Sequence, residues 1–329
     1  MMKDTSGKNM DYTVVPIKDF VAGAVLPVDL FIQLSEQKVI QIAHAGERVQ
    51  MERIRSYEQK NVSVLLIRNT DYTKYINEGL SIAGVIVRNK EIAQSQKQTV
   101  LTKMASNVFS QIEQMGLTPE AFQSSRVITG LTIALCSSKV DLYQLMSECA
   151  MADQSLYGHA VAVSTVSVMI GMGLNWKSVT IEKLGLGGLL HDIGKQELPP
   201  ALVKKSRMLM TKDEVKLYES HCIRGMEMLR AISDVPDDVI DIANEHHETC
   251  NGHGFPRKIK MMYINPLARV VGLADKFAQL TMKGTDTSFP KTPKEALDHI
   301  HKQLGQAFWP DAYDVLKSLL PAGSAQKAA

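Results

Sequence analysis

Histidine and aspartate residues gather in short segments of the C-terminal half of the chain. Five of the nine histidines fall in the segments YGHAVAV, GLLHDIGK, ESHCIRG and NEHHE, which contain His159, His191, His221, His246 and His247. Asp192 directly follows His191, and Asp275 lies further on in VVGLADKF. Imidazole and carboxylate ligands together suit iron or manganese, with zinc or nickel as substitutes in a purified sample. This set of residues therefore predicts a metal site.

Two of these positions are awkward for an ordinary protein core. At helical spacing His159 shares a face with Val163 and Val166, and Asp275 adjoins the apolar stripe that includes Val271. A carboxylate on an apolar helix face is costly unless it is paired or binds a cation. Taken singly, each residue has a plainer explanation: a hydrogen-bonded core histidine, a surface histidine pair, or an aspartate that faces water. If these histidines and aspartates converge on one core, each gains partners there, and their positions on apolar faces are accounted for together.

The order of the motifs is more specific than any one motif. HDxGK comes first, then a single histidine, then HHE, then an aspartate on a later helix. In this order the chain resembles the HD-GYP family, a subgroup of the HD phosphohydrolases, over roughly residues 151–320. The second signature of that family, HHExxDGxGYP, has its counterpart here in HHETCNGHGFP, which begins at His246.

The resemblance implies two metal ions that share one aspartate. One ion would be held by His159, His191, Asp192 and Asp275, and the other by Asp192, His221, His246 and His247. Two adjacent cations make a bridging water acidic enough to attack phosphorus, and they neutralise the developing charge. Asp192, as the bridging ligand, would therefore be central to catalysis.

Three further residues would contact the substrate. Lys195, four residues after His191, would place its ammonium on a phosphate oxygen. Gly254 and Phe255 lie in the loop that borders the active site in the family and serves partner recognition there. The plainer alternatives are a solvated lysine at a helix end and an ordinary connecting turn.

Some residues depart from the family pattern. Phe255 replaces the tyrosine of the signature and lacks its hydroxyl. After Asp275 the family usually has an arginine that meets the nucleotide phosphate, whereas the run here is DKFAQLTMKG, without an arginine. We expect Lys283 to bind the phosphate instead, more weakly, because lysine lacks the bidentate fork of arginine. Ser155 stands where members with a third metal have glutamate, so we expect two metal ions and not three.

The remaining sequence predicts the elements that position these residues. Residues 28–34, 38–42 and 61–68 are typical of strands, with a short helix at 48–59 between them. From about Tyr75 the pattern becomes helical. These features predict a small α+β module at the N-terminus.

Sharp helix-start signals appear in the C-terminal half. Thr211 and Glu214 have the spacing of a capping box, and Asn265 precedes Pro266 as a cap precedes a proline at the first helical position. We therefore predict an α+β N-terminal module followed by an all-α HD-type helical bundle. The expected division is a flexible N-terminus at 1–10, a regulatory or partner module at 11–77, a helical linker at 78–150, the metal-dependent phosphohydrolase domain at 151–322 and a flexible tail at 323–329.

Composition narrows the class of protein. The net charge of +2 gives no basic footprint of the kind that binds duplex nucleic acid. Neither a signal peptide nor an apolar stretch long enough to span a bilayer is visible. The four cysteines lack the spacing of a disulfide framework or a metal site and are interpreted as reduced thiols: Cys136, Cys149, Cys222 and Cys250. We expect a cytoplasmic protein without a membrane anchor.

The resemblance implies hydrolysis of cyclic di-GMP to pGpG or GMP in second-messenger signalling. Two alternatives stay open: a hydrolase of another cyclic dinucleotide such as cyclic GMP-AMP, and a weakly catalytic receptor for such a ligand. The altered run after Asp275 favours the alternatives, and the complete ligand set favours an enzyme. A regulatory protein could bind at the loop around Phe255 or at the N-terminal module, and a homodimer is open.

Overall fold

The structure, a computed structural model, describes residues 11–17, 20, 24–35, 38–50, 52, 56–57, 62–137, 156–284, 286–287, 289–304 and 307–320. The chain divides into two compact units, each described by itself below. The first contains residues 1–82 and 110–116, and the second contains residues 83–109 and 117–329.

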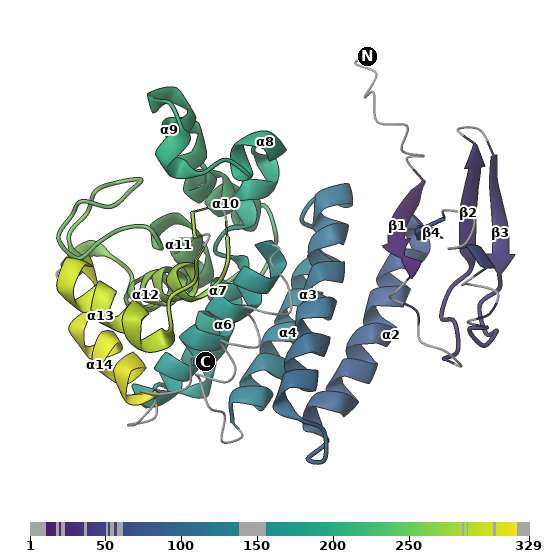
Figure 1. Ribbon diagram of the computed structural model, residues 1–329, viewed down its shortest axis with the longest axis horizontal. Coiled ribbons are helices and arrows are strands. Elements are labelled where there is room, and N and C mark those ends of the chain that lie inside the picture. The colour runs from purple at the N-terminus through teal and green to yellow at the C-terminus, as the bar shows by residue number, and fades with distance from the viewer. Residues whose placement is uncertain are drawn as a thin grey trace. The chain divides into compact units, whose positions relative to one another are not determined.

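The first unit contains a four-stranded antiparallel sheet, drawn as purple to blue arrows in Figure 1. Its strands are β1 (Tyr12–Pro16), β2 (Leu30–Ser35), β3 (Lys38–Ala43) and β4 (Val64–Arg68), in the spatial order β1-β4-β2-β3. Thr13 and Val15 of β1 are buried while their neighbours are half-buried, the alternation expected of a strand with one face on a core. The predicted strands are present. The helix predicted at 48–59 lies largely outside the described residues.

Long helices follow the sheet: α2 (Asn69–Arg88), α3 (Gln94–Met115) and α4 (Pro119–Cys136). The helix α2 begins directly after β4, earlier than the predicted start near Tyr75. Gly116, at a φ of 80°, separates α3 from α4, where a residue with a side chain would be strained. Thr118 caps α4 by accepting a hydrogen bond from the backbone N–H of Ala121 at 3.2 Å. Residues 138–155, which include Ser155 and Cys149, lie outside the described part of the chain.

The second unit is helical throughout its described C-terminal part, coloured teal to yellow in Figure 1. Its α-helices after residue 155 are α6 (Leu156–Gly173), α7 (Ser178–Leu190), α8 (Pro200–Val203), α9 (Lys212–Glu219), α10 (His221–Arg230), α11 (Asp237–Glu245), α12 (Pro266–Thr281), α13 (Pro293–Leu304) and α14 (Pro310–Ser318). Short 3-10 helices lie at Ile193–Glu197, Arg207–Leu209 and Met261–Tyr263. The helix α6 packs against α7 and α12, and α11 packs against α7, α10 and α12. The fold is therefore the predicted α+β module followed by an all-α bundle.

The predicted helix starts are confirmed. Thr211 and Glu214 form a reciprocal capping box, in which the N–H of Thr211 donates to the Glu214 carboxylate at 2.7 Å. The side chain of Asn265 accepts from the N–H of Leu267 at 2.9 Å, one residue after Pro266 enters α12. These caps fix the residues at which α9 and α12 begin. They therefore also fix the position of each later residue along these helices.

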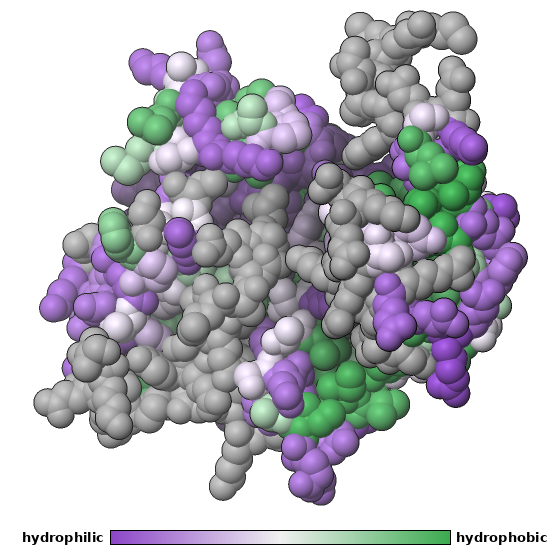
Figure 2. All heavy atoms as spheres, turned by 45° about the vertical axis from the view of Figure 1, so that its right-hand side comes forward, coloured by the Kyte–Doolittle hydropathy of each residue, from purple (hydrophilic) through white to green (hydrophobic). Residues whose placement is uncertain are grey.

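None of the helices among the described residues is both long and apolar enough to cross a membrane. On the face drawn in Figure 2, polar side chains in purple are interspersed with smaller apolar areas in green. Cys136, Cys222 and Cys250 are free thiols in the described part of the chain.

Candidate metal centre

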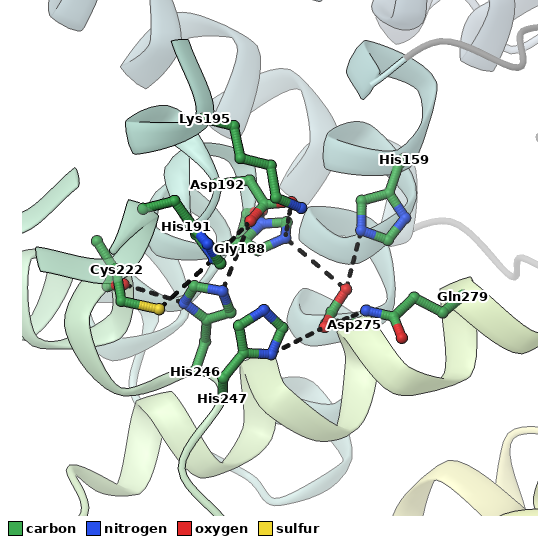
Figure 3. Close-up of polar contacts among 12 residues, drawn as sticks. His159, Gly188, His191, Asp192, Lys195, Cys222, His246, His247, Asp275 and Gln279 are labelled. Carbon is green, nitrogen blue, oxygen red and sulfur yellow. Dashed lines mark hydrogen bonds and ion pairs between the residues drawn. The ribbon is translucent and has the colours of Figure 1, made fainter. Parts of the chain in front are cut away.

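The seven predicted ligands come from five elements of the helical unit and converge in one place. Figure 3 labels all of them except His221. His159 lies in α6, and His191 and Asp192 follow the end of α7. The others are His221, the first residue of α10; His246 and His247, directly after α11; and Asp275 in the middle of α12. Each ligand except His159 and Asp275 lies at or next to a helix end.

Glycines allow these helix ends to approach one another. A Cβ atom added at Gly194 would lie 2.0 Å from the carbonyl oxygen of His221 and 2.4 Å from the backbone nitrogen of Gly225. A Cβ atom at Gly272 would lie 2.5 Å from the carbonyl oxygen of His246. All three distances are shorter than any real contact of a Cβ atom, so only glycine permits these packings.

Three candidate ligands, all histidines, lie on one side of Asp192. The ligand atoms of Asp192, His221, His246 and His247 all lie within 4.8 Å of one another. The Oδ1 atom of Asp192 is 3.3 Å from Nε2 of His221 and 3.6 Å from Nε2 of His246. This spacing leaves room for one cation between the carboxylate and the imidazoles.

A second group shares Asp192. Ligand atoms of His159, His191 and Asp192 also lie within 4.8 Å of one another. Asp275 Oδ1 lies 2.9 Å from His159 Nε2 and 3.8 Å from His191 Nε2. Gln279 donates to the other oxygen of Asp275 at 2.7 Å and so fixes this carboxylate. The geometry brings together every residue of the two predicted ligand sets, with Asp192 common to both; their role as ligands stays a prediction.

Backbone carbonyls set the tautomers of three histidines. The Nδ1 atoms of His191, His221 and His246 lie 2.8, 2.6 and 3.1 Å from carbonyl oxygens, which belong to Gly188, Tyr218 and both Ile242 and Ala243, respectively. A carbonyl oxygen can only accept, so Nδ1 must carry the proton. In the neutral form of such an imidazole, Nε2 then carries a lone pair. These lone pairs face the site, as they do in histidines that bind metals.

The protonation states leave the centre short of positive charge. Burial lowers the pKa of His221 to about 3, and burial also lowers the pKa of His247 well below its usual range. Burial would raise the pKa of Asp192, but the nearby Lys195 ammonium opposes this effect, and the pKa is held well below its usual range. At neutral pH, therefore, the neutral imidazoles of His221 and His247 lie close to an ionised Asp192 carboxylate.

Several atoms in the centre lack a hydrogen-bond partner. Within the described part of the chain these buried atoms are Nε2 of His191, His246 and His247, and Oδ1 of Asp192. An unpaired buried polar atom costs about 1–3 kcal/mol, and more for a charged group. One lone-pair acceptor cannot satisfy another, whereas cations bound in the two groups that share Asp192 would satisfy these atoms. The histidine and aspartate cluster therefore fits divalent metal ions.

Lys195 lies beside Asp192, in the 3-10 helix that follows it. Its Nζ atom is 2.5 Å from Asp192 Oδ2, and its side chain is largely buried. Burial alone would lower the pKa of Lys195, but the Asp192 carboxylate outweighs it and holds this pKa above its usual range. Lys195 is thus a fixed positive charge at the edge of the centre.

Tyr218 is a neighbour of the centre that the sequence did not suggest. Its ring centroid lies 5.2 Å from the Nζ atom of Lys195 and 5.2 Å from the ring of His221. The only available signal is its place three residues before His221, which puts its carbonyl on that histidine. Tyr218 therefore lines the side of the centre on which Lys195 lies.

The loop after His247 closes another side. The Phe255 ring lies 4.5 Å from the His247 ring, centroid to centroid. A Cβ atom at Gly254 would lie 2.3 Å from the carbonyl oxygen of His247, so the loop needs glycine there for packing. Glu248 holds the loop by accepting from the backbone N–H groups of Arg257 at 2.6 Å and Ile259 at 3.1 Å. Substrate contacts by Gly254 and Phe255 stay predictions.

Two further cations, Lys283 and Arg207, bear on contacts with the substrate. Lys283 is exposed, beyond the end of α12. Arg207, which the sequence did not suggest, has its guanidinium carbon 4.9 Å from the centroid of the Phe255 ring. No motif marks Arg207, because it meets the site through a loop that is distant in sequence.

Comparisons with known proteins agree with the fold and with the motif order. The HD domain family model matches residues 144–312, just over half of the chain. The chain is 32% identical over 130 residues to the cyclic di-GMP phosphodiesterase PA4108 of Pseudomonas aeruginosa, covering 40% of this chain and 31% of that protein. It is 28% identical over 128 residues to the 3′3′-cGAMP-specific phosphodiesterase 2 of Vibrio cholerae, covering 39% and 24%. The chain thus spans a third or less of the length of these two relatives.

A solved structure matches over nearly the whole length. The HDG"Y"P protein Bd1817 of Bdellovibrio bacteriovorus superposes with a TM-score of 0.67, over 94% of this chain and 99% of that chain, at 19% sequence identity. At this identity the likeness shows the fold. The chain belongs to the HD domain family, in agreement with the resemblance that its motifs suggested.

Proposed function

We propose that this chain is a metal-dependent phosphodiesterase that hydrolyses a cyclic dinucleotide, with cyclic di-GMP as the first candidate. The observation that carries the proposal is the cluster of unpaired Nε2 lone pairs around the ionised Asp192. Nothing in a folded core requires such an arrangement, and a pair of cations satisfies it. The names of the relatives supply the substrate class.

In this proposal His159, His191, Asp192 and Asp275 hold one ion, and Asp192, His221, His246 and His247 hold the other. The mixed imidazole and carboxylate set favours iron or manganese. When bound, such a pair lowers the pKa of a water molecule and neutralises charge on the phosphate oxygens. The expectation of two ions and not three rests on Ser155, which lies outside the described residues.

Residues of the chain orient the imidazole ligands, bind the phosphate and keep water away from His247. Carbonyl contacts to Nδ1 hold the imidazoles of His191, His221 and His246 in one tautomer. The ammonium of Lys195 lies where it can donate to a non-bridging phosphate oxygen while it stays paired with Asp192. Phe255 shields His247 from water on one side.

The wider assignments are part of the same proposal. The N-terminal sheet, with residues 11–77, is taken as a regulatory or partner module, and residues 78–150 as a helical connection to the catalytic domain at 151–322. A regulatory protein at the Phe255 loop, a homodimer and a cytoplasmic location belong to it as well.

A panel of cyclic dinucleotides tests the proposal. Anaerobically purified protein is incubated with cyclic di-GMP and with 3′3′-cyclic GMP-AMP, and the products are separated by chromatography. We expect cyclic di-GMP to yield pGpG and GMP. Faster turnover of cyclic GMP-AMP would favour the second candidate, which the Vibrio cholerae relative supports. Tight binding of cyclic di-GMP without turnover would favour a receptor.

Replacement of Lys195 should affect the chemical step more than binding. Its charge matters most as negative charge builds on phosphorus, so Lys195→Ala should lower kcat by about 100-fold, with a smaller change in KM. Metal content must be measured in parallel, because Lys195 also contacts Asp192. A variant with full metal content and unchanged kcat would remove Lys195 from the mechanism.

A further inference from the structure

Arg207 reaches the candidate site through an aromatic ring. Its guanidinium carbon lies 4.9 Å from the centroid of the Phe255 ring, and this ring lies 4.5 Å from that of His247. A guanidinium over an aromatic face is held by a cation–π interaction of about 0.5–1 kcal/mol at an exposed site. A single side chain therefore separates a permanent positive charge from a candidate metal ligand.

The backbone of Arg207 is fixed by the segment that follows α12. The Oδ1 atom of Asp286 accepts from the backbone N–H of Arg207 at 2.9 Å and from the hydroxyl of Ser206 at 2.6 Å. The sequence between Asp275 and Gly284 has no arginine. In this chain the segment beyond α12 thus contributes an acid that positions an arginine of another loop.

The side chain of Arg207 keeps donors for a ligand. One of its terminal nitrogens pairs with Glu219, and the side chain is 40% exposed. A guanidinium carries five N–H donors in a planar fork. A pair with one carboxylate oxygen and a stack on one ring leave donors free for a phosphate.

The proposed substrate has a second phosphate that requires a positive charge such as that of Arg207. A cyclic dinucleotide contains two phosphodiesters in one ring, and hydrolysis at the metal centre engages one of them. The other is an anion that lies away from the metals and has to be met by a cation. We propose that Arg207, stacked on Phe255 and positioned by Asp286, binds this second phosphate. The inference rests on the proposed function and adds a specificity residue to it.

A comparison of two substrates distinguishes binding of the second phosphate from hydrolysis of the first. Cyclic di-GMP has both, whereas bis(p-nitrophenyl) phosphate has a single phosphodiester and reports on the metal centre alone. Arg207→Ala should raise KM for cyclic di-GMP by about 10-fold, the lower end for a charge-assisted pair because the side chain is partly exposed. Hydrolysis of bis(p-nitrophenyl) phosphate should be unchanged. Equilibrium binding of the bis-phosphorothioate analogue of cyclic di-GMP should weaken by a similar factor.

Three variants sharpen the test. Arg207→Lys should recover part of the affinity, since it keeps the charge and loses the fork. Lys283→Ala, the rival cation, should raise KM for cyclic di-GMP by no more than about 3-fold, as an exposed charge does. The matched control is Arg126→Ala on α4, which removes an arginine paired with Glu182 at 3.0 Å on the surface and should change nothing.

The possible outcomes are distinct. Equal losses on both substrates in Arg207→Ala would mean a structural role and would overturn the inference, as would affinity equal to that of Arg126→Ala. A larger effect of Lys283→Ala than of Arg207→Ala would assign the phosphate to Lys283. Hydrolysis of bis(p-nitrophenyl) phosphate by the unaltered protein, without binding or turnover of any cyclic dinucleotide, would reject the proposed substrate class and this inference together.

Discussion

Asp192→Ala should abolish both metal retention and phosphodiester hydrolysis. Asp192 belongs to both candidate ligand groups, and its carboxylate lies within 3.6 Å of Nε2 of His191, His221 and His246. Without it, neither group keeps a carboxylate that can bridge two cations. We expect hydrolysis to fall to the background rate and metal content to fall below about one ion per chain. Elemental analysis and a turnover assay on the same preparation measure both effects.

His191→Ala provides the graded comparison. His191 belongs to one ligand group, so its loss should leave the other group able to hold an ion while hydrolysis is still lost. Asp192→Asn keeps the side-chain shape and guards against a folding defect in the alanine variant. Asp298→Ala, which removes an exposed carboxylate of α13, is the control and should behave as the unaltered protein. Unchanged turnover in both Asp192 variants would reject the assignment.

Gly194→Ala should destabilise the fold and weaken metal binding together. The added Cβ atom would lie 2.0 Å from the carbonyl oxygen of His221 and 2.4 Å from the backbone nitrogen of Gly225. Both are backbone atoms, so the 3-10 helix after Asp192 must move away from α10. We expect the free energy of unfolding to fall by about 3 kcal/mol or more, at the upper end for overpacking. Chemical denaturation of the metal-free protein measures this loss.

A second glycine gives the matched control. Gly130 lies on the exposed side of α4, and a Cβ atom there would meet nothing within 4 Å. Gly130→Ala should therefore stabilise the protein by about 0.5–1 kcal/mol through helix propensity. If Gly194→Ala were as well tolerated as Gly130→Ala, the close approach of Asp192 and His221 would not depend on this glycine.

The motif order was sufficient to predict which residues meet, because each motif marks a helix end or a buried helix face. In the structure His191, His246 and His247 lie at the ends of α7 and α11. The contacts of Tyr218 and Arg207 could not be predicted in this way. Each reaches the centre through a ring contact, Tyr218 beside Lys195 and Arg207 over Phe255, and such contacts follow from the packing of loops rather than from periodicity.

Part of the fold could also be predicted from the sequence. Capping residues located the starts of α9 and α12, since a cap is a local hydrogen bond that the sequence itself specifies. The start of α2 was misplaced, because β4 passes directly into the helix at Asn69 without a turn to mark the change. Gly254 was predicted to contact substrate, and its packing against the carbonyl of His247 was not foreseen, since close backbone approach leaves no periodic signal.

Metal analysis of anaerobically purified protein, with turnover of cyclic di-GMP measured on the same sample, tests the central claim most directly. The account predicts about two transition-metal ions per chain, with hydrolysis that rises and falls with metal content as the ions are removed and restored. Folded protein that binds no stoichiometric metal when iron or manganese is supplied under reducing conditions would contradict it, as would hydrolysis that persists after the metal has been removed.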